Sequence, residues 1–267
     1  SQESPKKAKM LGVKLVAPKL PQLLEKIKSL AEQYKNVIVF CARGGLRSES
    51  IISFSELIGL NNIYKLDGGY KAYRRFIIDN LEDYNLKSHL LVIHGFTGTG
   101  KTDLLYKLKE QGLPIIDLEG LANHRGSAFG SIGLGEPTNQ KQFDSLLWEQ
   151  LNKLEDAPII AVEAESKRIG ISVLPDFFLT AMEDGIHILL QRSLTTRVNQ
   201  IFNEYSKSYQ QDKEAFIDRT LESIAAVKKY LIQKIGKSGY QKVVKYCQNG
   251  KLKKVIQLLL TKYYDPL

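Results

Sequence analysis

The stretch from His89 to Tyr106, HLLVIHGFTGTGKTDLLY, constrains the fold of this chain more than any other part of the sequence. Its apolar beginning predicts a short parallel strand that is buried on both faces. The next segment matches the pattern G-x-x-x-x-G-K-[ST] at every fixed position, and an amphipathic helical pattern follows it. A strand, a glycine-rich loop and a helix, in this order, are the setting in which such a loop binds phosphate. The predicted phosphate-binding residues are Gly95, Gly98, Gly100, Lys101 and Thr102.

Each fixed position of this loop has a chemical reason. Glycines allow backbone N–H groups to approach phosphate oxygens, and the N-terminus of the following helix favours an anion. Lys101 supplies a positive charge for the outer phosphate, and Thr102 supplies a hydroxyl for Mg²⁺, which is a candidate ligand. The alternative is a tight glycine turn that binds nothing.

The composition favours a basic protein of the reducing cytoplasm. The 267 residues carry a net charge of +9, which favours a polyanionic partner such as nucleic acid over the alternative of a merely basic protein. No apolar run approaches the roughly 20 residues of a membrane helix, and the polar N-terminus predicts no secretion signal. Only two cysteines are present, and the four histidines lack metal-ligand spacing, so neither a disulfide scaffold nor a structural zinc site is expected.

Alternating strand and helix patterns predict an α/β fold with mostly parallel sheets, in two domains. The first domain covers residues 1–86 and begins with an extended or poorly ordered lead-in over residues 1–17. The second covers residues 87–267 and is a P-loop domain whose C-terminal region, from Thr195 on, is almost wholly helical. It also contains a long polar loop from Glu119 to Gln140, and loops of this length in compact domains are commonly functional.

Cys41 follows a predicted strand and begins the loop CARGGLRS, which leads into a predicted helix. Helix N-terminal N–H groups and two arginines would stabilise a thiolate there and lower its pKa. The glycine-containing loop is also a cradle for a tetrahedral anion, which Arg47 can bind bidentately. Cys41 and Arg47 are the candidate catalytic residues, and the candidate substrate-binding residues of this loop are Arg43, Gly44 and Gly45.

Two chemistries share this layout. The spacing C-x5-R describes cysteine phosphatases, in which the thiolate attacks phosphorus, and it also suits rhodanese-type loops, in which cysteine carries sulfur or selenium. Phe40 stands where a phosphatase loop usually has histidine, and the loop carries no obvious general acid, so the rhodanese type is favoured. The other cysteine, Cys247, lies in a Lys-rich helical pattern and is expected to be a packing residue.

Five segments, taken in order, resemble the tRNA 2-selenouridine synthase family, which joins a rhodanese-like domain to a P-loop domain. The fourth of them is the most specific, and the resemblance extends from about Ser4 to the C-terminus. The segments are CARGGLRS from Cys41, LDGGYKAYR from Leu66, the phosphate loop, DLEGLANHRGSAFG from Asp117 and VEAESKRIG from Val162.

The resemblance implies a two-step modification of the wobble uridine in tRNAs that read lysine, glutamine and glutamate codons. The sulfur of 2-thiouridine is first geranylated from geranyl diphosphate, and selenium from selenophosphate then replaces the S-geranyl group. Cys41 would be the residue needed for selenation, and the phosphate loop would hold the diphosphate of the prenyl donor rather than ATP. The expected partners are therefore 2-thiouridine-containing tRNA, both phosphorylated donors and, as a further candidate, the synthetase that makes selenophosphate.

Other candidate residues lie around the phosphate loop. Asn123, His124 and Arg125 belong to the loop expected to receive a splayed base or a phosphate, with structural roles in the loop as the alternative for the histidine and the arginine. Asp117 and Glu163 end predicted strands, and they are hypothesised to bind Mg²⁺ or to position water, with helix capping as the alternative. Three further arginines are expected to contact tRNA or to belong to a lid over the site, with a solvent-exposed surface position as the alternative: Arg168, Arg192 and Arg197.

A complete rhodanese domain has further strands and a helix before the segment SPKKAK, so the first domain is expected to be a partial one. The apolar strand from Val37 to Phe40 should then have an exposed edge or a partner chain that completes it. Two competing functions remain from the sequence: a P-loop kinase or ATPase fused to an anion-binding cysteine loop, and a tRNA-binding remnant that does not selenate.

Overall fold

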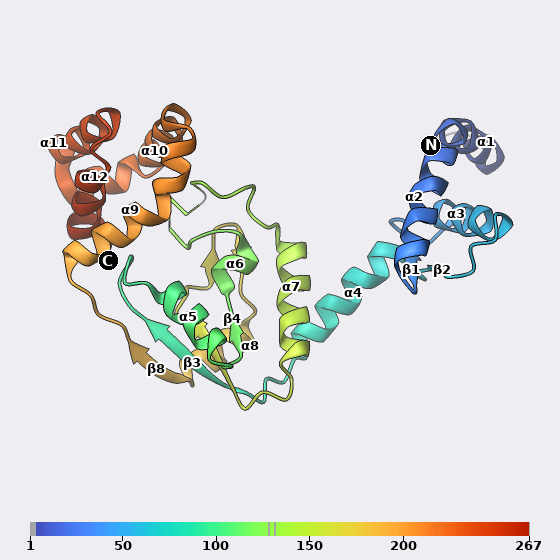
Figure 1. Ribbon diagram of the computed structural model, residues 1–267, viewed down its shortest axis with the longest axis horizontal. Helices are drawn as coiled ribbons and strands as arrows, with labels where there is room; N and C mark the ends of the chain where they lie inside the picture. The colour runs from blue at the N-terminus through green and yellow to red at the C-terminus, as the bar shows by residue number, and fades with distance from the viewer. Residues whose placement is uncertain (1–3, 128, 131, 267) are drawn as a thin grey trace. The chain divides into compact units, whose positions relative to one another are not determined.

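The computed structural model describes residues 4–127, 129–130 and 132–266 (Figure 1). The chain divides into two compact units, Ser1–Asp79 and Asn80–Leu267. The predicted domain boundary, after residue 86, falls just beyond helix α4 (Gly69–Glu82). Across the described ranges, no helix is both long and apolar enough to cross a membrane.

The first unit is a small α/β arrangement with a two-stranded parallel sheet. β1 pairs with β2 in the register Val37 to Ile63, and the described part of the chain gives β1 no second neighbour, as expected for an open edge. Ile38 on this strand is 61% exposed. The elements before α4 are α1 (Pro5–Val16), a 3-10 turn (Ala17–Lys19), α2 (Leu20–Gln33), β1 (Val37–Val39), α3 (Leu46–Leu57) and β2 (Ile63–Lys65).

The predicted lead-in over residues 1–17 is wrong for the part that is described, because α1 occupies most of it. Ser4 caps this helix, and its hydroxyl accepts a hydrogen bond from the backbone N–H of Lys7 at 3.4 Å. Pro5 takes the first helical position, where proline is tolerated since its missing N–H is not needed. Ser4 and Pro5 together are a signal for the start of a helix, and the prediction overlooked it because it relied on the polar composition of the segment.

The second unit is built on a four-stranded sheet with the order β4-β5-β3-β8, and all its pairs are parallel, as predicted. Ile93 on β3 pairs with Glu163 on β5, and His94 pairs with Leu189 on β8, so the carboxyl ends of the three strands meet. The elements are β3 (His89–His94), α5 (Lys101–Glu110), β4 (Ile115–Ile116), α6 (Leu118–Ala122), α7 (Gln140–Lys153), β5 (Ile159–Glu163), α8 (Asp176–Glu183) and β8 (Ile186–Leu189).

Four elements of this unit were not predicted. Helix α6 lies at the start of the segment expected to be a loop, and its N-cap is Asp117. The strands β6 (Arg168–Ile169) and β7 (Ser172–Val173) form a short antiparallel hairpin around Gly170, which has a φ of +60°. Helix α8 is the fourth. Elements this short leave too little periodicity for a sequence pattern to reveal.

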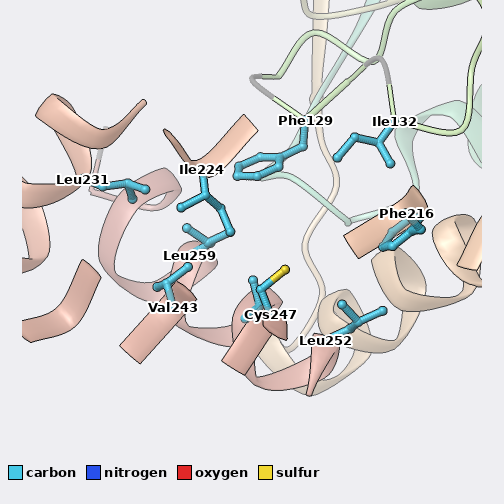
Figure 2. Close-up of a cluster of buried hydrophobic side chains, with 10 residues drawn as sticks. Phe129, Ile132, Phe216, Ile224, Leu231, Val243, Cys247, Leu252 and Leu259 are labelled. Atoms are coloured by element: carbon cyan, nitrogen blue, oxygen red, sulfur yellow. The ribbon is translucent and has the colours of Figure 1, made fainter. Parts of the chain in front are cut away.

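The C-terminal region is helical, as predicted, and in Figure 1 its helices form a group next to the sheet. They are α9 (Leu194–Gln211), α10 (Lys213–Ala226), α11 (Lys228–Gln248), α12 (Leu252–Leu259) and a π-helical turn (Leu260–Tyr264). Gly236 interrupts α11 with a φ of +71°. Figure 2 shows the apolar core between these helices, which also receives Phe129 and Ile132 from the long loop. Cys247 is fully buried there, and burial raises the pKa of its thiol to about 11, in keeping with a packing role.

Candidate active site

The phosphate loop connects β3 to α5, with left-handed backbone at Gly98 (φ +81°) and Gly100 (φ +80°). L-residues other than glycine rarely adopt this conformation. A Cβ atom on Gly98 would also lie 2.7 Å from Cδ1 of Ile201 on α9, so the loop passes directly against the helical region. Two independent constraints, conformation and space, therefore require glycine at this position.

The two polar residues at the start of α5 already have partners. The Lys101 ammonium donates a hydrogen bond to the carbonyl oxygen of Gly95 at 3.2 Å. The Thr102 hydroxyl donates to Oε1 of Glu163 at 2.5 Å. Parallel pairing of β3 with β5 produces this second contact, because it brings the end of β5 beside the loop.

A cluster of three carboxylates lies next to Thr102. Glu119 on α6, Glu163 at the end of β5 and Glu165 just after it each have an oxygen within 4.8 Å of the other two. Burial raises the pKa of Glu163 to about 7, against the lowering effect of the Thr102 hydroxyl. Burial also raises the pKa values of Glu119 and Glu165, and the carboxylate of Glu163 adds to the rise at Glu119.

Asp117, which the sequence nominated beside Glu163, takes a different position. Its Oδ1 accepts from the backbone N–H of Gly120 at 2.7 Å, and its Oδ2 accepts from the Tyr106 hydroxyl at 2.6 Å. This is the helix-capping alternative, with both oxygens occupied. The tyrosine contact raises the pKa of Tyr106 to about 12, because the carboxylate stabilises the protonated phenol.

A cavity of about 410 Å³ opens from the phosphate loop into the helical region. Its polar part includes Lys101, Thr102 and two of the clustered carboxylates, Glu119 and Glu165. The rest is bounded mainly by large apolar side chains from the long loop and from α9, α10 and α12. They include Phe129, Ile201, Phe216, Leu252, Val255 and Ile256.

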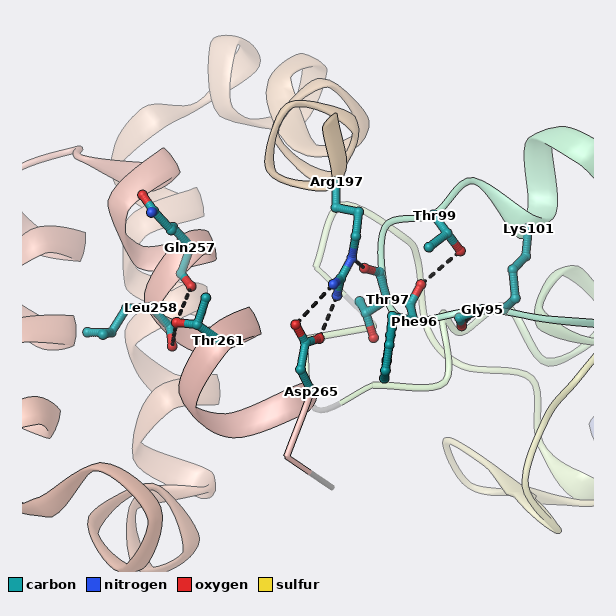
Figure 3. A network of polar contacts seen from close by, with 10 residues as sticks. All are labelled: Gly95, Phe96, Thr97, Thr99, Lys101, Arg197, Gln257, Leu258, Thr261 and Asp265. Carbon is teal, nitrogen blue, oxygen red and sulfur yellow. Dashed lines mark hydrogen bonds and ion pairs between the residues drawn. The ribbon is translucent and has the colours of Figure 1, made fainter. Parts of the chain in front are cut away.

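The three candidate arginines have different surroundings. The Arg192 guanidinium lies against the phosphate loop, since a Cβ atom on Gly100 would come within 3.1 Å of its Nη1. Arg197 is only 5% exposed, and it binds Asp265 through both terminal nitrogens at 3.0 and 2.6 Å (Figure 3). Arg168 is exposed on β6. Arg192 is therefore the candidate for an additional cation beside an anionic ligand, because the Arg197 guanidinium is bound to Asp265.

Arg197 also ties the phosphate loop to the C-terminal segment. Its Nε donates to the carbonyl oxygen of Thr97 at 2.8 Å, and its guanidinium lies 5.2 Å from the ring centroid of Phe96. Both of these residues are in the loop, and Figure 3 shows the network from Asp265 to the loop. Arg197 thus holds the phosphate loop in place through Thr97, and its remaining guanidinium nitrogens are bound to Asp265.

The three candidate residues of the long loop, Asn123, His124 and Arg125, also have different surroundings. Asn123 ends α6 in the left-handed conformation, and its amide donates to the carbonyl of Glu136 at 2.9 Å. His124 packs between Gly130 and Gly170, where a Cβ atom on either glycine would overlap its ring. Arg125 lines the cavity and stacks on Tyr205 at 4.8 Å from the ring centroid. Positions 128 and 131 of this loop lie outside the described residues.

The Cys41 loop lies in the first unit and packs against the turn at Gly68 and Gly69. A Cβ atom on Gly44 would lie 2.7 Å from the backbone nitrogens of both of these glycines, so this approach requires glycine. The Ser48 hydroxyl lies 3.4 Å from the Cys41 sulfur. This hydroxyl, followed by the backbone N–H of Arg43, lowers the pKa of Cys41 to about 6.

The low pKa of Cys41 was expected, and backbone N–H groups contribute to it as predicted, but a serine hydroxyl takes the place of the two predicted arginines. The contributing groups are a hydroxyl and backbone amides, rather than guanidinium groups. Arg43 and Arg47 are exposed side chains, and Ser48, which is 2% exposed, was not among the sequence candidates. The roles of Arg43, Gly44, Gly45 and Arg47 in binding an anion stay predictions.

Sequence reasoning also missed Glu119 and Glu165. A signal for Glu165 was present, because it stands two residues after Glu163, and alternate residues of an extended segment share a face. Glu119 likewise stands two residues after Asp117, but a helix begins between them and turns it toward the cluster. Only the folded arrangement distinguishes the capping carboxylate from the clustered one.

The fold and the site together define a P-loop α/β protein with a helical C-terminal region and an apolar cavity beside its phosphate loop. The family model described as the tRNA 2-selenouridine synthase AAA domain matches residues 88–267. This chain belongs to that family.

Curated relatives extend the match into the first unit. The tRNA 2-selenouridine synthase of Shewanella halifaxensis (strain HAW-EB4) is 36% identical over 249 residues, 86% of this chain and 66% of that protein. That of Shewanella woodyi (strain ATCC 51908 / MS32) is 32% identical, over 96% of this chain and 74% of its own. The chain thus spans about two thirds of the first relative. Among solved structures, a DNA replication initiation factor aligns with 18% identity over 65% of this chain and 63% of that one, at a TM-score of only 0.26.

Proposed function

We propose that this chain acts in the reaction that its relatives' name describes, the formation of 2-selenouridine in tRNA, and that the modified residue is the wobble uridine. In the proposed reaction the second unit transfers a geranyl group from geranyl diphosphate to the sulfur of 2-thiouridine. Selenium from selenophosphate then bonds to C2 of the base as the bond from C2 to the S-geranyl sulfur breaks, so that geranylthiol leaves, and water cleaves the selenium–phosphorus bond to release phosphate; this step uses Cys41. Membership of the family supports the reaction class, and the geometry of the cavity supports the identity of the first donor.

The observation that carries the proposal is the composition of the cavity. Its polar part has the phosphate loop and Lys101, and most of the remainder is apolar, including Phe216, Leu252 and Val255. A prenyl diphosphate has the same division, with a charged head and a hydrocarbon chain. The base and ribose of ATP would bring polar groups against these side chains, and polar groups buried without hydrogen bonds cost free energy. The cavity therefore favours a prenyl diphosphate over a nucleotide.

The charges around the loop suit departure of diphosphate. The sulfur of the thiouracil forms a bond to C1 of the geranyl group, the bond from C1 to the diphosphate oxygen breaks, and the N3 proton leaves to solvent. Negative charge grows on the departing diphosphate, where Lys101, Arg192 and the N-terminus of α5 would stabilise it. Lys101 must exchange its present contact with Gly95 for the phosphate to do this.

The first unit suits the second step. A thiol with a pKa of about 6 is mostly thiolate at neutral pH, which is the ionised form that the proposed role of Cys41 in the selenium step needs. The net charge of +9 suits tRNA, since phosphate contacts dominate such affinity. The proposal includes selenophosphate, its synthetase and a chain that completes the first unit as candidate partners.

Mass spectrometry of nucleosides tests the proposed reaction. Full-length chain is incubated with 2-thiouridine tRNA and geranyl diphosphate, and selenophosphate is added afterwards. We expect a geranyl adduct that converts to 2-selenouridine, and we expect Cys41→Ser to stop only the conversion. Unmodified nucleoside together with Lys101-dependent ATP hydrolysis would support the kinase or ATPase alternative, whereas retained tRNA binding without either reaction would support the remnant.

A variant of the cavity tests the donor site. Ile256 lines the cavity from α12, and Ile256→Trp should fill the apolar part. Transfer from geranyl diphosphate should fall at least tenfold, while the shorter dimethylallyl diphosphate should still react. Gln257→Trp, an exposed change on the same helix, is the matched control. Equal loss with both donors, or no loss with either, would contradict this placement of the prenyl chain.

A further inference from the structure

The net positive charge of the chain comes entirely from its last helices. Between Glu222 and Asp265 the sequence contains ten lysines and neither aspartate nor glutamate. The whole chain has 38 basic and 29 acidic residues, so the rest of it has 28 basic against 29 acidic residues and is nearly neutral. Most of the ten lysines are on α11 and α12, the two helices at the red end of the chain in Figure 1. We call them the lysine surface.

The charges of the lysine surface are exposed and uncompensated. All ten side chains are exposed, and within the described residues none of them forms an ion pair. Lys253 donates to the amide oxygen of Asn199 at 2.8 Å, and the Lys228 ammonium lies 5.6 Å from the ring centroid of Tyr240. Neither contact cancels a charge. Like charges this close repel one another and oppose compact folding, so their accumulation indicates an anionic partner.

The lysines of α11 and α12 belong to one continuous surface. On α11, Val243 is buried while Lys242 and Lys245 are exposed, and on α12 the buried Val255 follows two exposed lysines. The two helices meet where the Lys254 ammonium lies 5.7 Å from the ring centroid of Tyr246 on α11. Both helices therefore turn their apolar sides to the core and their lysines to solvent.

The distribution of apolar and acidic residues favours RNA over a membrane surface as the partner. A helix that lies on a membrane needs an exposed apolar face, whereas in this described segment Tyr230 is the one large apolar side chain that is strongly exposed. RNA phosphates need only accessible positive charge. Glu214, Asp218 and Glu222 recur every fourth residue on α10 and are exposed, so they limit the lysine surface on that side.

We propose that the lysine surface binds the phosphate backbone of tRNA. The identity of the RNA rests on the proposed function, in which tRNA is the substrate. Leu252 and Val255 of α12 line the cavity beside the phosphate loop, so RNA bound to the exposed side of this helix lies near the proposed prenyl site. Such contacts position the RNA without reading its bases.

Fluorescence anisotropy of labelled 2-thiouridine tRNA, titrated with the full chain at several salt concentrations, tests the surface. The α11 variant replaces three lysines, which have no printed role in packing, by the uncharged glutamine. Each lost phosphate contact lowers the slope of log affinity against log salt by about 0.7–1, so the slope should fall by about two to three and the affinity at least about tenfold. The replacements are Lys237→Gln, Lys242→Gln and Lys245→Gln.

A second variant keeps the test open if circular dichroism shows that the first does not fold. It removes three lysines before the break at Gly236 and should weaken tRNA binding in the same way. The replacements are Lys228→Gln, Lys229→Gln and Lys234→Gln.

The matched control removes the same charge from exposed positions on α5 and α7 of the same unit, through Lys107→Gln, Lys109→Gln and Lys153→Gln. Its affinity and salt slope should equal those of the wild type. Equal losses in the control and the α11 variant would overturn the proposal, because net charge alone would then govern binding. Unchanged tRNA binding by the α11 variant would also overturn it. If that variant instead lost binding to vesicles of phosphatidylserine and phosphatidylcholine, the partner would be a membrane.

The proposed function is judged separately, by the geranyl adduct in the same tRNA. Binding that depends on the α11 lysines, without an adduct, would uphold the lysine surface and refute the prenyl reaction. Adduct formation with an unchanged KM for tRNA in the α11 variant would uphold the reaction and refute the surface.

Discussion

Replacing Ser48 by alanine should raise the pKa of the Cys41 thiol, because the Ser48 hydroxyl is the largest cause of its lowering to about 6. With that pKa, about 90% of the thiol is ionised at pH 7, against about 1% for the ordinary value of 9.0. Loss of one hydrogen bond to a charged group corresponds to a rise of roughly one to two pKa units. The backbone N–H groups of the loop remain, so the pKa should not return fully to its ordinary value.

The assay is the rate of iodoacetamide alkylation at Cys41 as a function of pH, followed by mass spectrometry of the labelled peptide. A lowered pKa means that the thiolate is present above about pH 6 and is lost as the pH falls through that value. We expect a wild-type midpoint near 6 and a higher midpoint for Ser48→Ala. The peptide map separates Cys41 from Cys247, which is fully buried and should react only after unfolding.

Ser50→Ala is the matched control, because Ser50 lies on the same helix and its hydroxyl donates to the carbonyl of Leu46 at 2.7 Å. Its midpoint should equal that of the wild type. A wild-type midpoint near 9, or a midpoint that Ser48→Ala leaves in place, would refute the reasoning. The Ser48 hydroxyl would then not set the pKa of the Cys41 thiol.

Two further predictions concern the second unit. Gly98→Ala should destabilise it by at least about 2 kcal/mol, because the left-handed backbone and the contact with α9 both oppose a Cβ atom. Gly112 also has a positive φ, but open space surrounds it, so Gly112→Ala should cost only about 1 kcal/mol. Denaturant unfolding measures the difference, and equal losses would contradict the spatial argument. Asp265→Asn should cost about 3 kcal/mol and lower Tm by roughly 6–12 °C, because Arg197 keeps a buried charge without its partner. Asp176→Asn, which breaks an exposed ion pair, is the thermal-melt control and should cost less than about 1 kcal/mol.

Local signals in the sequence were sufficient for the phosphate loop and for the parallel sheet around it. The strand before Gly95, the loop itself and the helix from Lys101 are contiguous, and each has its own pattern, so no tertiary information was needed. The same holds for the helical C-terminal region, because long amphipathic segments with a helical period are hard to mistake for strands. The break at Gly236, by contrast, depends on a single residue.

The carboxylate cluster and the cavity could not be predicted in this way. Both require knowing which face of α6 turns inward, and whether Asp117 or Glu119 points to the loop depends on where that short helix begins. The environment of Cys41 shows the same limit. Arginines near a cysteine in sequence suggested charge stabilisation, but the packed loop brings a hydroxyl and amides to the sulfur and leaves the guanidinium groups exposed.

The C-terminal helices form an apolar core and also line the cavity, and some residues take part in both. Phe216, Leu252 and Val255 belong to this buried core and also line the cavity beside the phosphate loop. A ligand whose hydrocarbon chain occupies the cavity adds apolar contacts to this core, so its binding free energy adds directly to the stability of the folded unit. Ligand binding and folding of the C-terminal helices are therefore linked. Substitutions such as Phe216→Ala should weaken both together, whereas Ile256→Trp, which fills part of the cavity and keeps a large apolar side chain at that position, should weaken mainly ligand binding.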